Sequence, residues 1–361
     1  MKPNPYFSSR SNIYYQVPEF PAVSSLAIAK ALTTLADQPT TIMFHAEMTP
    51  PITASVGDEV QSSEPPLAPS GPLTSYSTFL SSRPPSFETY AISEIISLAH
   101  LAPSLSLHIV HLSALETIPV LRAARSAGVK ITAETCPHYL TLSSETIPEG
   151  DTRHKCCPPI RNLSNQSALW SELLHPPQND SVIKTIVSDH SPCTPDLKLL
   201  PPTIKNHTHT NNPNPNLAPN KASGNFFESW GGISSVGLTL PLLFTALTAR
   251  YPHLPLSKLL SLIINWTATA TASQVGLAHQ KGQLAPGLDG DVVVFDPDEQ
   301  WTLGVERMWF RNKCSPYQGW RFRGGVRETW LRGGRVFARE GGFGVGADKP
   351  RGRLLLEPRT V

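Results

Sequence analysis

Three ionisable residues stand at the ends of apolar runs that are typical of buried strands. His45 closes the run in TTIMFHAE, His111 closes LSLHIVH, and Asp189 closes SVIKTIVSD. Imidazole and carboxylate groups are usual ligands of catalytic zinc, and a carboxylate beside the metal can also take a proton from bound water. A lone buried acid more often forms an ion pair or a helix cap, so the two histidines favour the catalytic interpretation. We therefore predict a metal-dependent hydrolase in which these three residues meet.

The alternation of side chains along a strand decides between neighbouring candidates. His108 and His111 are three positions apart, so on a regular strand they point to opposite faces of the sheet. We assign His111 to the site because it lies at the carboxyl end, and we expect His108 to face the surrounding helices as a structural residue. Asp189 and His190 present the same choice, and there the acid is preferred because it can both bind a cation and accept a proton.

Strands and helices alternate in the part of the chain that must position these residues. The predicted helices are 24–36, 87–102, 114–128 and 165–174, and the predicted strands are 40–47, 105–111, 130–137 and 181–189. The connections are long enough for parallel crossovers, which predicts an α/β fold of the (β/α)8 TIM-barrel type. Such a barrel builds its active site at the carboxyl ends of its strands, where all three candidate ligands stand.

Two proline-rich stretches and a change of pattern suggest the domain organisation. We predict a partial barrel over 1–278, interrupted by surface insertions at about 49–87 and about 199–220. The second stretch contains His207 and His209, which we interpret as solvated loop residues because no strand flanks them. Residues 279–361 contain short β-segments separated by Gly and Pro, which predicts a small C-terminal β-domain with a tail.

Composition excludes several classes of protein. The formal net charge is +2, so no basic field favours nucleic acid or a membrane surface as a partner. The five cysteines form no C-x-x-C pair and are odd in number, which favours a reduced, cytoplasmic protein. No apolar run reaches about 18 residues, the length that a membrane-spanning helix requires. The first residues also lack the apolar stretch of a secretory signal.

Several local motifs carry a family resemblance. ETCPHYLTL, KCCPPIRN, SDHSPC and WGGISSVGL, preceded by FHAE and followed by LAPGLDGDVVVFDP, resemble the allantoinases of the cyclic amidohydrolase group. The resemblance extends from about Glu19 to about Phe337. SDHSPC and WGGI favour allantoinase over dihydroorotase or hydantoinase. The resemblance implies a small-molecule substrate, allantoin, whose cyclic amide bond is hydrolysed to give allantoate in purine catabolism.

The same resemblance assigns roles to individual residues. In this family an H-x-H pair, a carboxylated lysine, two single histidines and an aspartate hold two zinc ions. His45 and His111 match the histidines of the fifth and sixth strands, and Asp189 matches the aspartate of the eighth strand, which also acts as general base. The backbone around Cys157 matches the loop that binds the substrate's ring amide. Gly231 and Gly232 match a turn that lets backbone approach the ligand, although a plain turn before a helix would also account for them.

Three of the family's six ligands have no counterpart here. No histidine precedes His45, and the only lysines before it are Lys2 and Lys30, neither at a predicted strand end. We therefore expect only strands five to eight of the barrel, with open sheet edges and negligible activity of this chain alone. The first interpretation is an allantoinase whose first half lies outside this sequence. A non-catalytic paralogue that pairs with a complete relative and a hydantoinase- or dihydroorotase-like enzyme remain open, and the resemblance suggests a homotetramer.

Overall fold

A parallel β-sheet organises the amino-terminal part of the chain. The computed structural model describes residues 6–9, 23–50, 67–175, 181–204, 223–344 and 351–355, with the backbone alone for 6–9. The sheet contains, in spatial order, β1 (Tyr6–Ser9), β2 (Thr41–Ala46), β3 (Ser106–Ile109), β4 (Ile131–Thr135) and β5 (Ile183–Ile186). All four neighbouring pairs are parallel. This arrangement confirms the predicted α/β class and adds β1, which the sequence pattern did not predict.

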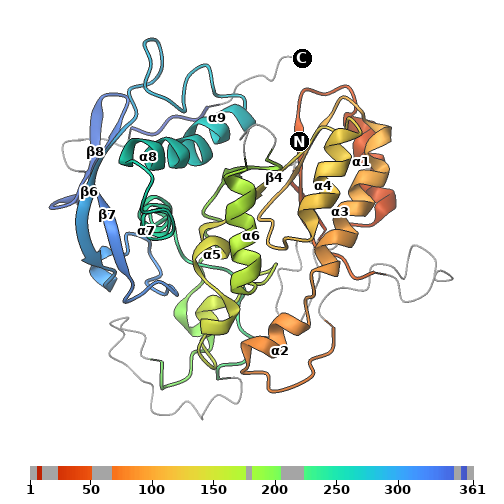
Figure 1. Ribbon diagram of the computed structural model, residues 1–361, viewed down its shortest axis with the longest axis horizontal. Coiled ribbons are helices and arrows are strands. Elements are labelled where there is room, and N and C mark those ends of the chain that lie inside the picture. The colour runs from red at the N-terminus through yellow and green to blue at the C-terminus, as the bar shows by residue number, and fades with distance from the viewer. Residues whose placement is uncertain are drawn as a thin grey trace. The chain divides into compact units, whose positions relative to one another are not determined.

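Helices connect the consecutive strands of this sheet. They are α1 (Ser25–Leu35), α2 (Tyr76–Ser81), α3 (Ser86–Leu98), α4 (Thr117–Ser126), α5 (Pro137–Thr141) and α6 (Leu163–Leu173). Figure 1 shows α1, α3 and α4 side by side. Ser24 caps α1 by accepting a hydrogen bond from the Ala27 N–H, and Gly128 after α4 has φ +92°, as its C-terminal position requires.

The core of this unit lies against one face of the sheet. In β2 the side chains of Ile42, Phe44 and Ala46 are buried, whereas those of Met43 and His45 between them are partly exposed. This alternation is the period of two that a half-buried strand requires. His45 therefore lies on the face opposite the apolar core, and the registers of the neighbouring strands extend that face across the sheet.

The predicted insertion at 49–87 is wrong over its second part. Residues 51–66 lie outside the described residues, but Tyr76, Phe79 and Arg83 that follow are almost completely buried. Tyr76 and Phe79 lie in α2, and the Tyr76 hydroxyl donates to the carbonyl of Ile160 at 3.0 Å. The proline and serine content suggested a loop, whereas the aromatic residues add to the core. Most of the second predicted insertion, 205–220, lies outside the described residues.

The chain divides into two compact units at a different place from the predicted one. The first comprises 1–236, 310–316 and 361, and the second comprises 237–309 and 317–360. The predicted boundary between 278 and 279 thus falls within the second unit. The physical reason is that α7 is attached to the β-sheet of that unit: Thr245 Oγ1 accepts a hydrogen bond from the Arg323 N–H at 2.9 Å, and Phe244 packs edge-on against Phe295.

The second unit combines helices with an antiparallel sheet. Its helices are α7 (Thr239–Arg250), α8 (Leu256–Ile264) and α9 (Ala270–Gln274), with a π-helical turn over Asn265–Thr269 between the last two. Its sheet has the order β6 (Val292–Thr302), β7 (Arg321–Leu331), β8 (Gly334–Ala338) and β9 (Gly342–Phe343). These strands lie where the sequence predicts short β-segments.

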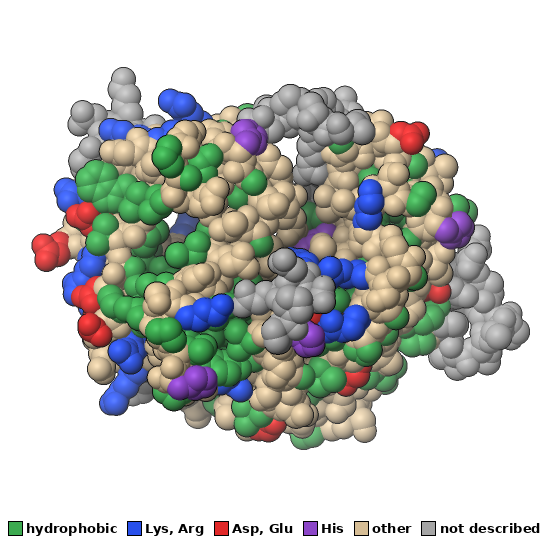
Figure 2. All heavy atoms as spheres, turned by 45° about the horizontal axis from the view of Figure 1, so that its top comes forward, with side chains coloured by type: hydrophobic (Ala, Val, Ile, Leu, Met, Phe, Trp, Pro, Cys, Tyr) green, Lys and Arg blue, Asp and Glu red, His purple; other side chains and the backbone are tan. Residues whose placement is uncertain are grey.

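Helix length and surface charge relate to the predictions about membranes and nucleic acids. Within the described part of the chain, every helix is too short or too polar to cross a bilayer. On the face shown in Figure 2, lysine and arginine side chains are interspersed with acidic ones.

Candidate functional site

The candidate ligands lie at one edge of the parallel sheet. His45 is near the end of β2, His111 follows β3 by two residues, and Asp189 follows β5 by three. Parallel strands present their carboxyl ends at the same edge, and ligands of α/β proteins bind there. The order β2, β3, β4, β5 across the sheet also puts Cys136, which directly follows β4, between His111 and Asp189.

The structure brings His45 and His111 into direct contact. Nδ1 of His45 and Nε2 of His111 are 2.9 Å apart, and the two rings meet edge-on. The other ring nitrogen of His45, Nε2, lies 3.1 Å from Oε2 of Glu47, which also accepts a hydrogen bond from Arg83 at 3.1 Å. A carboxylate that holds the far nitrogen of a histidine orients the ring and increases its basicity as a metal ligand.

Electrostatics keep His111 in a form suited to a cation. Burial lowers the pKa of His111, and His45 lowers it further, although Asp189 acts in the opposite direction. A neutral imidazole is the form that binds a metal. Burial alone would raise the pKa of Glu47, but the Arg83 guanidinium and the contact with His45 lower it to about 2. In addition, Nδ1 of His111 is buried without a hydrogen-bond partner among the described residues. These features fit a metal ion.

The backbone is strained at two of the three predicted ligands. His111 has φ 38° and Asp189 has φ 43°, in the left-handed region that non-glycine residues rarely occupy. The only other non-glycine residues with positive φ in the described part of the chain are Leu199 and Arg332. Such strain persists where surrounding structure enforces it, and it occurs preferentially at functional sites.

The prediction for His108 is wrong. His108 pairs in register with Met43 and Thr132, so its side chain shares the face of the sheet that carries Met43 and His45 instead of facing the helices. There its Nδ1 lies 2.8 Å from Thr132 Oγ1 and its Nε2 lies 3.2 Å from Glu134 Oε2. The predicted structural role of His108 agrees with these contacts, because its ring is fully buried between Thr132 and Glu134. The face assignment failed because β3 ends at Ile109, and the alternation does not extend to His111.

Asp189 has neighbours that the sequence did not suggest. Among the described residues, Cys136, His138 and Asp189 have ligand atoms that all lie within 4.8 Å of one another. Asp189 is thus grouped with these two residues and not with the histidine pair, and the combination of His45, His111 and Asp189 stays a prediction. The sequence does contain a signal, a C-P-H tripeptide directly after the residues of β4, but a buried cysteine there is equally typical of a packing residue. Burial lowers the pKa of His138 to about 3.

The Cys157 thiol interacts electrostatically with the Glu47–Arg83 pair. Burial raises the pKa of this thiol, the nearby Arg83 lowers it, and Glu47 raises it again. Cys157 therefore lies close to the Glu47–Arg83 pair that orients His45. The peptide bond from Cys157 to Pro158 is cis.

Two buried lysines hold the segment that contains Gly231 and Gly232. Nζ of Lys155 donates to the carbonyls of Phe227 and Ser229, at 3.0 and 2.6 Å. Nζ of Lys198 donates to the carbonyls of Trp230 and Gly232, at 3.0 and 2.6 Å. The Gly232 N–H in turn donates to the Lys155 carbonyl at 2.7 Å. The turn is thereby fixed from two sides.

We expect Gly232→Ala to destabilise the first unit by about 2 to 4 kcal/mol, whereas Gly231→Ala changes its stability by less than about 0.5 kcal/mol. Gly232 has φ +137°, and a Cβ there would lie 2.4 Å from the Ser191 carbonyl oxygen. At Gly231 the nearest atom to a new Cβ is Lys155 Cε, at 3.9 Å. Urea unfolding of the two variants measures the difference, and equal midpoints would contradict the close approach.

The stability of the chain should rise with pH above neutrality because of Lys155. Burial lowers its pKa from 10.5 to about 7, so below pH 7 both states are charged and the full burial penalty applies. Between the folded-state pKa of about 7 and the unfolded-state pKa of 10.5, Lys155 keeps its proton in the unfolded chain but has lost it in the folded chain. The free energy of unfolding therefore rises by about 2 kcal/mol from about pH 7 to pH 9. Lys155→Met should flatten this slope in urea titrations, whereas Lys130→Met, at an exposed position, should keep it. An unchanged slope in Lys155→Met would refute the assignment.

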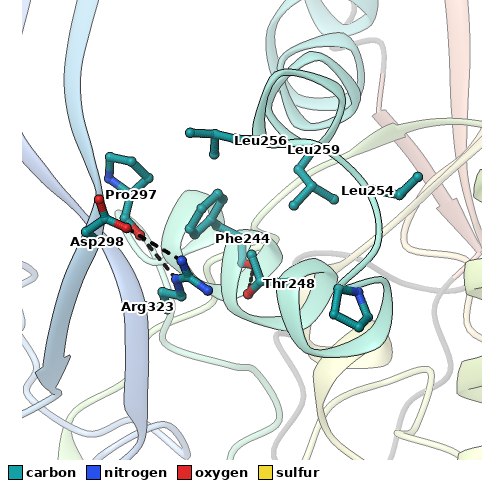
Figure 3. A pocket seen from close by; sticks show the side chains of 9 residues that line it. Phe244, Thr248, Leu254, Leu256, Leu259, Pro297, Asp298 and Arg323 are labelled. Carbon is teal, nitrogen blue, oxygen red and sulfur yellow. Dashed lines mark hydrogen bonds and ion pairs between the residues drawn. The ribbon is translucent and has the colours of Figure 1, made fainter.

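A pocket in the second unit contains none of the predicted site residues. Figure 3 shows it between α7, α8 and the strands β6 and β7. Its lining is largely apolar, with Phe244, Leu256 and Leu259 beside the Arg323–Asp298 ion pair.

Comparison with known proteins identifies relatives in one group. The chain is 40% identical over 345 residues to an allantoinase of Saccharomyces cerevisiae, which covers 95% of this chain and 64% of the relative. It is 34% identical to an allantoinase of Streptomyces avermitilis, over 94% of this chain and 64% of the relative. The chain thus spans 64% of the length of each of these two relatives. No protein-family model matches the chain.

Solved structures with a similar fold include hydantoinases. L-hydantoinase (dihydropyrimidinase) from Arthrobacter aurescens superposes with a TM-score of 0.67 at 21% identity, over 98% of this chain and 66% of that chain. D-hydantoinase (dihydropyrimidinase) from Thermus sp. superposes with a TM-score of 0.69 at 20% identity, over 94% of this chain and 64% of that chain. At this identity the similarity concerns the fold, and it supports the barrel type that the sequence predicts.

Proposed function

We propose that this chain, which is 40% and 34% identical to two allantoinases over most of its own length, hydrolyses the cyclic amide bond of allantoin to give allantoate. The contact between His45 and His111 carries the proposal, because two imidazoles at 2.9 Å on the carboxyl edge of a parallel sheet are arranged to share one cation. Asp189 follows the strand at the other end of the described sheet and influences the pKa of His111.

We propose that His45, His111 and Asp189 hold zinc. When bound, zinc supplies Lewis-acid polarisation of the substrate carbonyl and lowers the pKa of water. The carboxylate of Asp189 takes the proton from the attacking water and returns it to the leaving ring nitrogen. Glu47, itself held by Arg83, fixes the orientation of the His45 ring.

The substrate would lie against backbone at the same edge. We propose that the backbone of Cys157 hydrogen-bonds the ring amide and that Gly231 and Gly232 let the chain approach the ring closely. The lysines that clamp Ser229 to Gly232 keep this surface preorganised, which is how binding geometry contributes to rate. The homotetramer suggested by the family resemblance and the cytoplasmic location favoured by the cysteine content stay predictions.

Allantoin is preferred over other cyclic amides because the relatives at 34 and 40% identity are allantoinases, whereas the hydantoinases match at 20 to 23% identity. The test is an assay of allantoate formation by the purified chain with zinc. It is run alone and after co-expression with the part of the Saccharomyces relative that the match does not cover, with hydantoin and dihydroorotate as competing substrates. Turnover of allantoin in either preparation supports the proposal. Exclusive turnover of hydantoin or dihydroorotate contradicts the substrate, and a folded protein without turnover in both preparations favours a non-catalytic paralogue.

A further inference from the structure

A second set of metal-ligating side chains lies at the carboxyl edge of the sheet. We propose that Cys136, His138 and Asp189 form a binding site for a thiophilic divalent cation such as zinc, distinct from the pair made by His45 and His111. The Sγ, ring nitrogen and carboxylate oxygen of the three residues all lie within 4.8 Å of one another. This inference does not depend on which cyclic amide the protein hydrolyses.

The topology of the sheet brings the three ligands together. Cys136 directly follows β4, and His138 lies in α5, which begins at Pro137. Asp189 follows β5, the strand that pairs with β4 in parallel register. The ends of two neighbouring parallel strands therefore deliver all three side chains. The strained backbone of Asp189, at φ 43°, turns its chain away from the strand direction at this point.

His138 points most directly to a ligand. Its side chain is completely buried, and neither ring nitrogen has a hydrogen-bond partner among the described residues. A buried polar atom without a partner costs about 1 to 3 kcal/mol, so native proteins rarely leave one and still more rarely leave two in the same ring. Tyr139 covers the ring edge-on with centroids 4.2 Å apart, which does not satisfy either nitrogen. A cation would satisfy the ring nitrogen that it contacts.

The donor set indicates which cations fit. A thiolate, an imidazole and a carboxylate are three of the usual protein ligands of zinc, and the combination leaves one position of a tetrahedral site open. Thiolate selects zinc, cobalt and copper over magnesium and calcium, which prefer oxygen ligands. The buried Cys136 thiol would lose its proton to solvent when the cation binds. Asp189 is shared with the proposed hydrolytic site, so the two sets of ligands compete for it or hold adjacent ions.

Cobalt(II) provides a readout that is independent of turnover. Titrating Co²⁺ into the metal-free chain should produce a near-ultraviolet absorption band from thiolate-to-cobalt charge transfer, together with strong visible bands of four-coordinate cobalt. Cys136→Ser should remove the charge-transfer band. Cys193→Ser, which changes another buried thiol of the same unit, should keep it. His138→Gln should keep the band but weaken cobalt binding by on the order of 10- to 100-fold.

Several outcomes would overturn the site. They are a wild-type spectrum without charge-transfer absorption, a band that survives Cys136→Ser, and unchanged cobalt affinity in His138→Gln. If Cys136→Ser does not fold, His138→Gln still decides, because it retains the thiolate and must weaken the cobalt binding that the charge-transfer band reports. Circular dichroism of each variant distinguishes loss of the site from loss of the fold.

Discussion

Replacing Asp189 by Asn should lower kcat/KM for allantoin by on the order of 10³-fold in whichever preparation hydrolyses it, because general-base catalysis contributes about 10²- to 10⁴-fold. Asparagine has almost the same shape as aspartate but carries no charge and cannot accept the proton of the attacking water. The measurement is allantoate formation at subsaturating allantoin. Asp37→Asn, at an exposed aspartate of the same unit, is the matched control and should retain full activity.

The metal content of Asp189→Asn separates the two roles of the carboxylate. If the variant retains zinc and loses turnover, Asp189 acts chiefly as the proton acceptor. If zinc and turnover are lost together, Asp189 is needed as a ligand. Retention of more than about a tenth of the wild-type rate would exclude Asp189 as general base, since removal of such a group costs at least about 10²-fold.

The strand ends were predictable, but the turns that follow them were not. Apolar runs before His45, His111 and Asp189 identify strands β2, β3 and β5, and alternation with helices identifies the carboxyl edge. The period of two holds only within a strand. His111 lies beyond the end of β3 at φ 38°, so its side-chain direction depends on a turn that no periodicity reveals. For the same reason His108 was assigned to the wrong face.

Long-range partners account for most of what the sequence did not reveal. Arg83 stands in a stretch whose prolines and serines predict a surface loop, yet it is buried and donates to Glu47, 36 residues earlier. Local composition contains no information about such a contact. Cys136 and His138 present the same limitation, because a buried thiol and a buried imidazole are packing residues unless another strand end brings a third ligand to them. Here Asp189, after β5, is that third ligand.

A comparable contact holds the turn after His111, and it leads to the largest expected loss of stability. Glu88, on α3, is almost fully buried. Its Oε2 accepts hydrogen bonds from the N–H groups of Ser113 and Ala114, at 2.9 and 3.1 Å, and its Oε1 accepts from Arg161 at 2.7 Å. Arg161 also donates to the backbone carbonyl of Arg83 at 3.3 Å, so its guanidinium pairs with both this acid and a carbonyl.

Glu88→Gln should destabilise the first unit by about 3 to 5 kcal/mol, because removing one partner leaves the buried Arg161 charge uncompensated. The glutamine amide also directs its N–H₂ either at the guanidinium or at the two backbone donors, so one side loses its acceptor. Urea unfolding measures this change in the free energy of unfolding, as a shift of the midpoint with an unchanged dependence of that free energy on urea concentration. Glu94→Gln, on the same helix but partly exposed, is the matched control and should cost less than about 1 kcal/mol.

The double variant Glu88→Gln with Arg161→Met determines whether the charge pair is the cause. If the unpaired guanidinium accounts for the loss, Arg161→Met in the Glu88→Gln background should cost far less than in the wild type, with a coupling of about 2 kcal/mol or more. Additive effects would mean that the two backbone N–H groups of Ser113 and Ala114 dominate. Either result bears on the site, because these N–H groups begin two residues after His111 and hold the strained turn that presents its ring to His45.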